Sequence, residues 1–186
     1  PRERLPHVRL HNGTIWRWNR PLNGFDDRGR PHLRIEHRVL PSGPSVPDCI
    51  ANAALYFGAL AELLRSTPDA ERVLPFLQAR AGFYTCAREG LEAEIQWLDG
   101  HIHPVRTILT EDLLPRARRG LAALGIDQAE SDHWLGILTA RTETRRTGAR
   151  WQRTWVERHG PDMQGLVRAY LERLRSGRPV HEWDLE

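Results

Sequence analysis

Three charged residues at alternate positions of residues 31–40 have the types and spacing of a phosphate or metal site. Arg34, Glu36 and Arg38 lie in a stretch that we predict to be a β-strand. Because alternate side chains of a strand share a face, the two arginines and the carboxylate would project together. The opposite face would carry the less polar residues, namely Leu33, Ile35, His37 and Val39.

This alternation has two interpretations. Charged side chains commonly lie on the solvent face of an antiparallel sheet and pair across strands, and the spacing alone favours that reading. In the other reading, Glu36 offers a hard oxygen ligand to Mg²⁺, and Arg38 binds a phosphate oxygen held by the same ion. Arg34 would bind phosphate or orient Glu36. Arg17 and Arg20, just upstream, would extend this basic surface, or Arg17 would stack on the neighbouring tryptophans.

Other candidate groups carry weaker signals. His37 falls on the apolar face and is expected to pack there. His101 and His103 lie two residues apart without a third metal ligand nearby. The segment RRTGARWQ (145–152) gathers arginines around Thr147-Gly148. It is interpreted as a capped helix start with exposed arginines, and the alternative is a helix N-terminus that faces an anion.

The composition excludes several kinds of chemistry. All 27 basic residues are arginine, so the chain has no lysine for a Walker-type phosphate loop or a Schiff base. The net charge of +3 is spread among 24 acidic residues, so we expect no nucleic-acid partner. No apolar run approaches the roughly 20 residues of a membrane span, so we expect no membrane association. Cys49 and Cys86 are expected to be reduced, structural thiols of a cytoplasmic protein.

The candidate site precedes a long helical region. We predict strands at 13–18 and 32–40, joined by a loop at 19–31 that contains Asn-Gly and Arg-Gly turn signals. Residues 1–45 would be the β-hairpin portion of a catalytic sheet, and residues 46–186 a helical region packed on it in one domain. The predicted class is therefore α+β, a small antiparallel sheet or hairpin followed by a bundle of about six helices.

The helical boundaries follow from caps and breakers. Ser45 would cap a helix over 47–66, which is apolar on nearly all sides and so expected to be buried. A helix starting at 67–69 would be shortened by Pro75. We expect further helices at 80–98, from 110 to a glycine at 125, from a Ser131 cap to about 145, at 147–160 and at 161–176. A linker at 101–106 and an extended C-terminal tail complete the prediction.

The run RIEHRVLPSGPSVPDCIANAALYFGALAEL (34–63) resembles the glutamine synthetase-like carboxylate–amine ligases, and more closely the bacterial glutamate–cysteine ligase family. In that superfamily a strand carrying Glu-x-Arg precedes a Pro-containing turn and a long, Ala-rich apolar helix. Upstream, HNGTIWRWNRP resembles the family's arginine-bearing strand. LLPRARRGLAALGID, RRTGARWQ and GRPVHEW are similar to segments of a subgroup of these ligases.

The resemblance implies an ATP-dependent ligase that joins glutamate to an amine acceptor through an acyl phosphate, with ATP and Mg²⁺ as cofactors. Glu36 would correspond to a metal-binding glutamate and Arg38 to an arginine that faces the γ-phosphate. Arg20, and less directly Arg17, would correspond to arginines that contact substrate or phosphate, with Arg34 as a further cofactor contact.

The chain also departs from the family pattern. The superfamily places several acidic metal ligands on strands near the N-terminus, whereas residues 1–35 contain only Glu3, Asp26 and Asp27 as carboxylates. The sequence begins at Pro1 without a methionine. We therefore expect a C-terminal portion that needs a preceding N-terminal half, is inactive alone and is compatible with homo-oligomer formation. The alternatives are a non-catalytic helical interaction domain that retains the sheet edge, and an arginine-rich binder of nucleic acid or an acidic partner.

Overall fold

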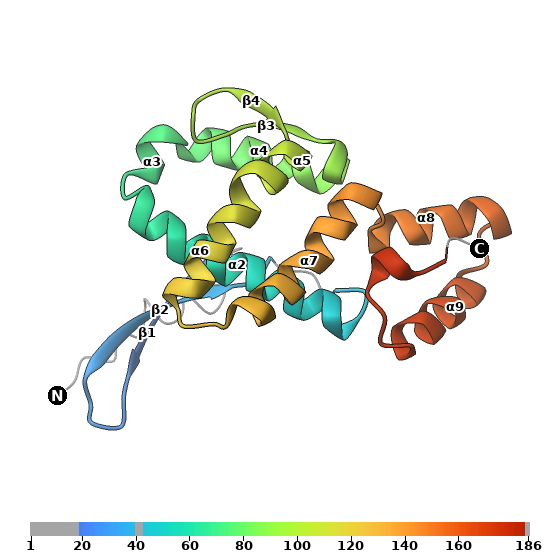
Figure 1. The fold of residues 1–186 in the computed structure, drawn as a ribbon, viewed down its shortest axis with the longest axis horizontal. Helices are drawn as coiled ribbons and strands as arrows, with labels where there is room; N and C mark the ends of the chain where they lie inside the picture. The colour runs from blue at the N-terminus through green and yellow to red at the C-terminus, as the bar shows by residue number, and fades with distance from the viewer. Residues whose placement is uncertain (1–18, 40–42, 185–186) are drawn as a thin grey trace, which may run out of the picture. The chain divides into compact units, whose positions relative to one another are not determined.

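The computed structural model of the chain describes residues 19–39 and 43–184 (Figure 1). The chain divides into two compact units, Pro1–Ser42 and Gly43–Glu186. The first contains a β-hairpin, and the second contains the helices and a short second hairpin. The α+β class is as predicted. The strand predicted at residues 13–18 lies outside the described residues.

In the first unit, β1 (Asn19–Phe25) pairs antiparallel with β2 (Pro31–His37). Residues 19–25 therefore form a strand and not the loop that we predicted, and β2 ends before residue 40. Of the two turn signals in the predicted loop, Asn23-Gly24 lies within β1, and the chain turns after Phe25 at Arg28-Gly29. There the carboxylate of Asp26 accepts hydrogen bonds from the backbone N–H groups of Arg28 and Arg30, and Gly29 supplies the positive φ of 75°.

In the second unit, α2 (Val46–Ser66) is the central helix, and α6 (Leu114–Ala123) and α7 (Gln128–Thr144) pack against it. Ser45 caps α2 as predicted, since its hydroxyl accepts from the Asp48 backbone N–H. The helices α2 and α6 cross at glycines. A Cβ on Gly120 would lie 1.8 Å from the Gly58 carbonyl oxygen. Their shared core contains Ala51, Ala59, Leu114, Ala117, Leu121, Leu135, Ile137 and Leu138.

The expectation that α2 is buried on nearly all sides is wrong. Ile50, Phe57 and Leu64, seven residues apart, are 41%, 58% and 70% exposed. In the described residues, α6 and α7 bury the side of α2 that carries Ala51, Gly58 and Ala59. This arrangement leaves an apolar stripe uncovered on another face of the helix.

A second hairpin replaces part of a predicted helix. The short α3 (Ala70–Val73) ends before Pro75 as expected, but α4 (Phe76–Glu89) stops at Gly90, whose φ is +60°. A 3₁₀ turn (Gly90–Glu92) leads into β3 (Glu94–Gln96), which pairs with β4 (Ile102–Pro104) across the Asp99-Gly100 turn. The predicted helix over 80–98 is thus too long, and the predicted linker contains β4. The strand β3 packs against α4, where Ile95 lies close to Gly82.

The chain then continues through α5 (Val105–Thr107) and a π-helical turn (Ile108–Leu113) into α6. The helical structure therefore begins before the predicted start at residue 110. Gly125, with φ of +81°, follows the end of α6 as predicted. Asp127, and not Ser131, caps α7, because its carboxylate accepts from the N–H groups of Ala129 and Glu130.

The C-terminal residues form a second small core. Thr147 caps α8 (Gly148–His159), and Asp162 caps α9 (Met163–Arg175). The last segment was predicted to be an extended tail, but it contains a 3₁₀ turn (Val180–Glu182) and folds back onto the helices (Figure 1). Trp151, Trp155, Val180 and Trp183 are all buried in this core. The segment folds back because its apolar side chains gain buried area there.

Among the described residues, no helix combines the length and apolarity needed to cross a bilayer.

Candidate functional site

The charged face of the first hairpin brings together three of the predicted site residues. The register places Arg20 directly opposite Glu36. The Arg20 Nη2 atom lies 2.7 Å from Glu36 Oε2, and the Arg38 Nε atom lies 2.9 Å from the same oxygen. These side chains are 21%, 37% and 19% exposed in the order Arg20, Glu36 and Arg38. Two guanidinium groups thus converge on one carboxylate at the hairpin surface.

This arrangement affects how Glu36 ionises. The hydrogen bond from Arg38, helped by the positive charge of Arg20, lowers the pKa of the Glu36 carboxyl below its ordinary value. Glu36 is therefore ionised at neutral pH and fixes both guanidinium groups. The three side chains together carry two positive charges and one negative charge.

The other predicted arginines are placed differently. Arg34 lies on β2 opposite Leu22 and is exposed, and it forms no ion pair with a described residue. Arg34 does not pair with Glu36, so the structure does not support the prediction that Arg34 orients the Glu36 carboxylate. Arg17 lies outside the described residues.

The described residues alone do not fit a complete Mg²⁺ site. In the part of the chain that the structure describes, no group of three or more His, Cys, Asp or Glu side chains could hold a metal ion. Glu36 provides one carboxylate, and one of its oxygens contacts two guanidinium groups. A hexacoordinate cation would need further oxygen ligands. His103 is paired with Asp99 at 2.7 Å, and that pairing is local to the β3–β4 turn.

The face opposite the arginines is apolar and largely exposed. It carries Phe25, Leu33 and Ile35, which are 60%, 79% and 73% exposed. His37 lies at the end of this face, where its ring Nδ1 is 2.7 Å from Asn19 Oδ1. Partial burial lowers the pKa of His37, so its neutral form is favoured at pH 7.

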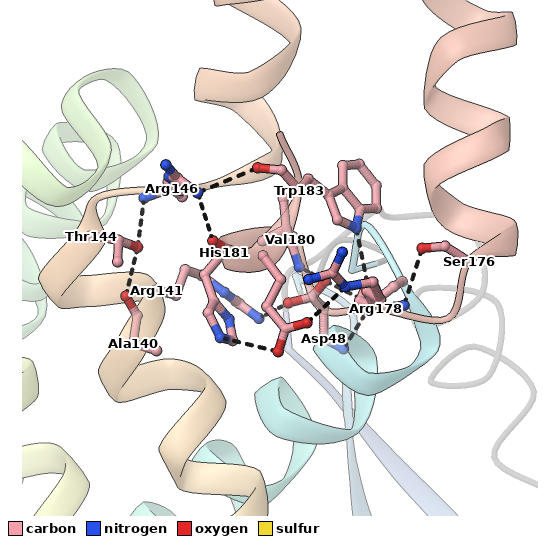
Figure 2. A network of polar contacts seen from close by, with 12 residues as sticks. Asp48, Ala140, Arg141, Thr144, Arg146, Ser176, Arg178, Val180, His181 and Trp183 are labelled. Carbon is pink, nitrogen blue, oxygen red and sulfur yellow. Dashed lines mark hydrogen bonds and ion pairs between the residues drawn. The ribbon is translucent and has the colours of Figure 1, made fainter. Parts of the chain in front are cut away.

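A buried polar network joins the start of α2 to α7 and the C-terminal segment (Figure 2). The Asp48 carboxylate is fully buried and accepts from the Ser45 hydroxyl at 2.8 Å, from Arg141 Nη2 at 2.5 Å and from the Val180 backbone N–H at 2.9 Å. Arg141 also donates to Asn52 at 2.8 Å. Sequence reasoning assigned no role to Asp48 beyond the first turn of the helix.

Two residues of the RRTGARWQ segment also contact the C-terminal segment. Arg146 donates to the backbone carbonyl oxygens of His181 and Trp183, at 3.2 and 3.4 Å (Figure 2). The Trp151 indole N–H donates to the Asp184 carbonyl at 2.8 Å. Arg146 and Trp151 therefore hold the C-terminal segment in place. Thr147 is a helix cap, as we predicted for this segment.

Comparison with known proteins gives one informative similarity. The chain is 37% identical over 164 residues to a putative glutamate–cysteine ligase 2-1 of Frankia casuarinae. The alignment covers 81% of this chain and 39% of that protein. No family model matches the chain, and no solved structure matches it.

The similarity places this chain among the relatives of a ligase family. It confirms the predicted resemblance to the glutamate–cysteine ligase family, which was based on the Glu-x-Arg strand and the long helix after it. The chain spans less than half of the length of that relative.

Proposed function

We propose that this chain forms part of an ATP-dependent carboxylate–amine ligase that joins glutamate to an amine through an acyl phosphate. The observation that carries the proposal is the convergence of Arg20 and Arg38 on Glu36, in a chain related to a putative glutamate–cysteine ligase. ATP and Mg²⁺ would be the cofactors of the intact enzyme, and glutamate and an amine acceptor its substrates.

The chemistry of the cluster suits phosphate. A transferring phosphoryl group spreads negative charge over its oxygens, and catalysis depends mainly on positioning and electrostatic stabilisation. A guanidinium group is planar and presents several N–H donors in a fixed fork. Because Glu36 fixes both forks in advance, Arg20 and Arg38 would bind phosphate oxygens with little loss of side-chain freedom.

Glu36 then has two proposed roles. It positions the arginines, and it supplies one oxygen toward a divalent cation in the intact enzyme. Mg²⁺, when bound, would neutralise phosphate charge and bridge phosphate oxygens. The further ligands would come from parts of the ligase outside the described residues, so we expect the chain alone to bind nucleotide and Mg²⁺ poorly. We place the ligase in the cytoplasm, because both cysteines are free thiols.

A second candidate function is a non-catalytic interaction domain. The observation that favours it is the pair of exposed apolar stripes, one on α2 and one on α9, where Met163 is 51% and Val167 65% exposed. Contiguous apolar surface commonly marks a protein interface. In the ligase these stripes would pack against the rest of the enzyme or a second copy, whereas in the interaction domain they would bind a separate protein.

The test is ADP release that depends on glutamate and an amine, measured for an intact ligase that contains this chain. Arg38→Lys keeps the positive charge but loses the planar, two-donor guanidinium group. We expect turnover to fall about 100-fold, which is the typical effect of removing one hydrogen-bond donor to a transition state. The matched control is Arg30→Lys, in the hairpin turn, where the arginine pairs with Asp26. Equal turnover in the two variants would contradict the assignment of Arg38. Absence of ligase activity in every form would favour the interaction domain.

A further inference from the structure

The helical unit contains a large cavity that is separate from the charged hairpin. Its volume is about 840 Å³, within the range of small-molecule sites. It is lined by residues of α2, the end of α4, α7 and α8, together with Val105 and Leu109. None of the hairpin residues lines it, so an inference about this cavity does not depend on the proposed ligase function.

Arginines line the cavity from α8 and from the turn before it. Arg150 and Arg153 line it from one face of α8, and neither forms an ion pair with a described residue. Arg145 also lines the cavity, from the turn after α7. Among the described residues, Arg145 is the one non-glycine residue with a positive φ, which is 55°. Its only ion pair with a described residue is a long one, 3.6 Å from Arg145 Nη1 to Glu92 Oε1.

Acidic residues also line the cavity and offset part of its positive charge. Glu92 is engaged by Arg145, Glu89 lies 3.8 Å from Arg88, and Glu157 lies one helical turn beyond Arg153. Arg141 also lines the cavity and is already paired with Asp48. Its Nε atom is nevertheless buried without a hydrogen-bond partner among the described residues. The lining arginines outnumber the lining glutamates five to three.

Apolar side chains from other elements also line the cavity. Leu55 of α2, Leu138 of α7, and Val105 and Leu109 line it. A ligand that matches both kinds of lining would place an apolar body against these side chains and an anionic group against the arginines of α8. Guanidinium groups bind carboxylates and phosphates through charge-assisted hydrogen bonds, and both anionic groups share this chemistry.

We propose that this cavity binds a small amphipathic organic anion, with its carboxylate or phosphate held by Arg145, Arg150 and Arg153. The apolar body of the ligand packs on the leucine and valine wall. The site is distinct from the phosphate-binding surface proposed for Arg20 and Arg38.

Calorimetric titration of this chain tests the proposal with four probes, namely hexyl phosphate, hexanoate, inorganic phosphate and hexanol. We expect hexyl phosphate or hexanoate to bind more tightly than inorganic phosphate and hexanol, because only the first two carry both an anionic group and an apolar chain. The stronger of these two identifies the preferred anionic group. Equal binding of inorganic phosphate and hexyl phosphate, or no binding of either amphipathic anion, would overturn the proposal.

Charge-reversal variants locate the binding. Arg150→Glu with Arg153→Glu should weaken the binding of the preferred probe about tenfold or more, because two charge-assisted contacts become repulsive. If that variant folds poorly, Arg150→Gln with Arg153→Gln, which removes the two charges without adding repulsion, should also weaken binding of the probe. Two exposed arginines of α9 provide the control, Arg168→Glu with Arg175→Glu, which makes the same charge change away from the cavity. Equal weakening in the control would show that binding reflects net charge and would overturn the site.

A cysteine in the lining provides an independent readout. Cys86 lines the cavity, and Cys49 does not. The preferred probe should slow alkylation of Cys86 and leave Cys49 unaffected, measured by peptide mass spectrometry. Unchanged alkylation of Cys86 at saturating probe would place the ligand elsewhere and overturn the proposal.

Discussion

Replacing Asp48 by Asn tests how the helical unit holds its C-terminal segment. Asp48 is fully buried, and its carboxylate accepts from Ser45, Arg141 and the backbone of Val180. The Asn side chain has nearly the same shape but no charge, and its amide group would face donors. Arg141, whose side chain is 14% exposed, would be left without its counter-charge.

The expected loss of stability follows from that stranded charge. Removing one partner of a buried ion pair costs about 3–5 kcal/mol. The lower end applies here, about 3 kcal/mol, because Asn keeps one acceptor oxygen and Arg141 retains its hydrogen bond to Asn52. The lost bond to the Val180 N–H is part of the same network, so its energy should not be added separately.

Urea unfolding followed by circular dichroism measures this change, since the signal comes mainly from the helices. The midpoint should fall without a change in slope, and hydrogen exchange should speed up at the Val180 amide. The matched control is Asp132→Asn, which removes an exposed carboxylate 2.6 Å from Arg118 Nε. Exposed pairs contribute little, so the control should stay close to the parent protein.

Two results would refute the reasoning. One is a similar loss of stability in the Asp48 and Asp132 variants. The other concerns Asp48→Leu combined with Arg141→Met, which replaces the pair with apolar groups. If the cost arises from a stranded charge, the double variant should be more stable than Asp48→Asn. An equally unstable double variant would assign the loss to packing or to the N-terminus of α2.

Three further predictions concern the helix crossing, the C-terminal segment and the cavity. Gly120→Ala should destabilise the protein by about 1–3 kcal/mol or more, since the new methyl group would clash with the Gly58 backbone. The control is Gly136→Ala, whose new methyl group would meet nothing within 4 Å. This control should stabilise the protein by about 0.5–1 kcal/mol, and urea unfolding measures both changes. Burial lowers the pKa of His181 below its ordinary value of 6.5. The unfolded chain therefore binds the proton more readily than the folded chain, and the stability should fall as the pH drops below 6.5 toward the lowered pKa. His181→Gln should reduce this dependence of stability on pH, as measured by thermal melts at a series of pH values. Burial raises the pKa of the Cys86 thiol, so its alkylation at pH 7 should be slow and should accelerate in alkaline buffer. Mass spectrometry follows the alkylation, and a rapid reaction at pH 7 would contradict the prediction.

The sequence determined the features that depend on neighbouring residues. Ser45 and Thr147 cap helices, Pro75 separates two helices and Gly125 ends a third, because each acts on backbone groups within a few positions of itself. The alternation of residues 34–38 likewise indicated which side chains project from the same face of the hairpin. The resemblance to the ligase family was carried by the same local run and is confirmed by the similarity to a relative.

Tertiary structure decided which distant groups meet. Arg20 faces Glu36 only because the chain turns at Asp26 and Gly29, and a one-residue shift of register would send Arg20 to the other face. Asp48 meets the Val180 N–H across 132 positions, and no local pattern identifies that pair. Tertiary packing also determines the exposed stripe of α2 and the arginine-lined cavity, because both depend on which helices lie next to one another. Periodicity shows that a face is apolar, but burial requires a neighbouring element, and the position of that element is set by packing across the whole fold.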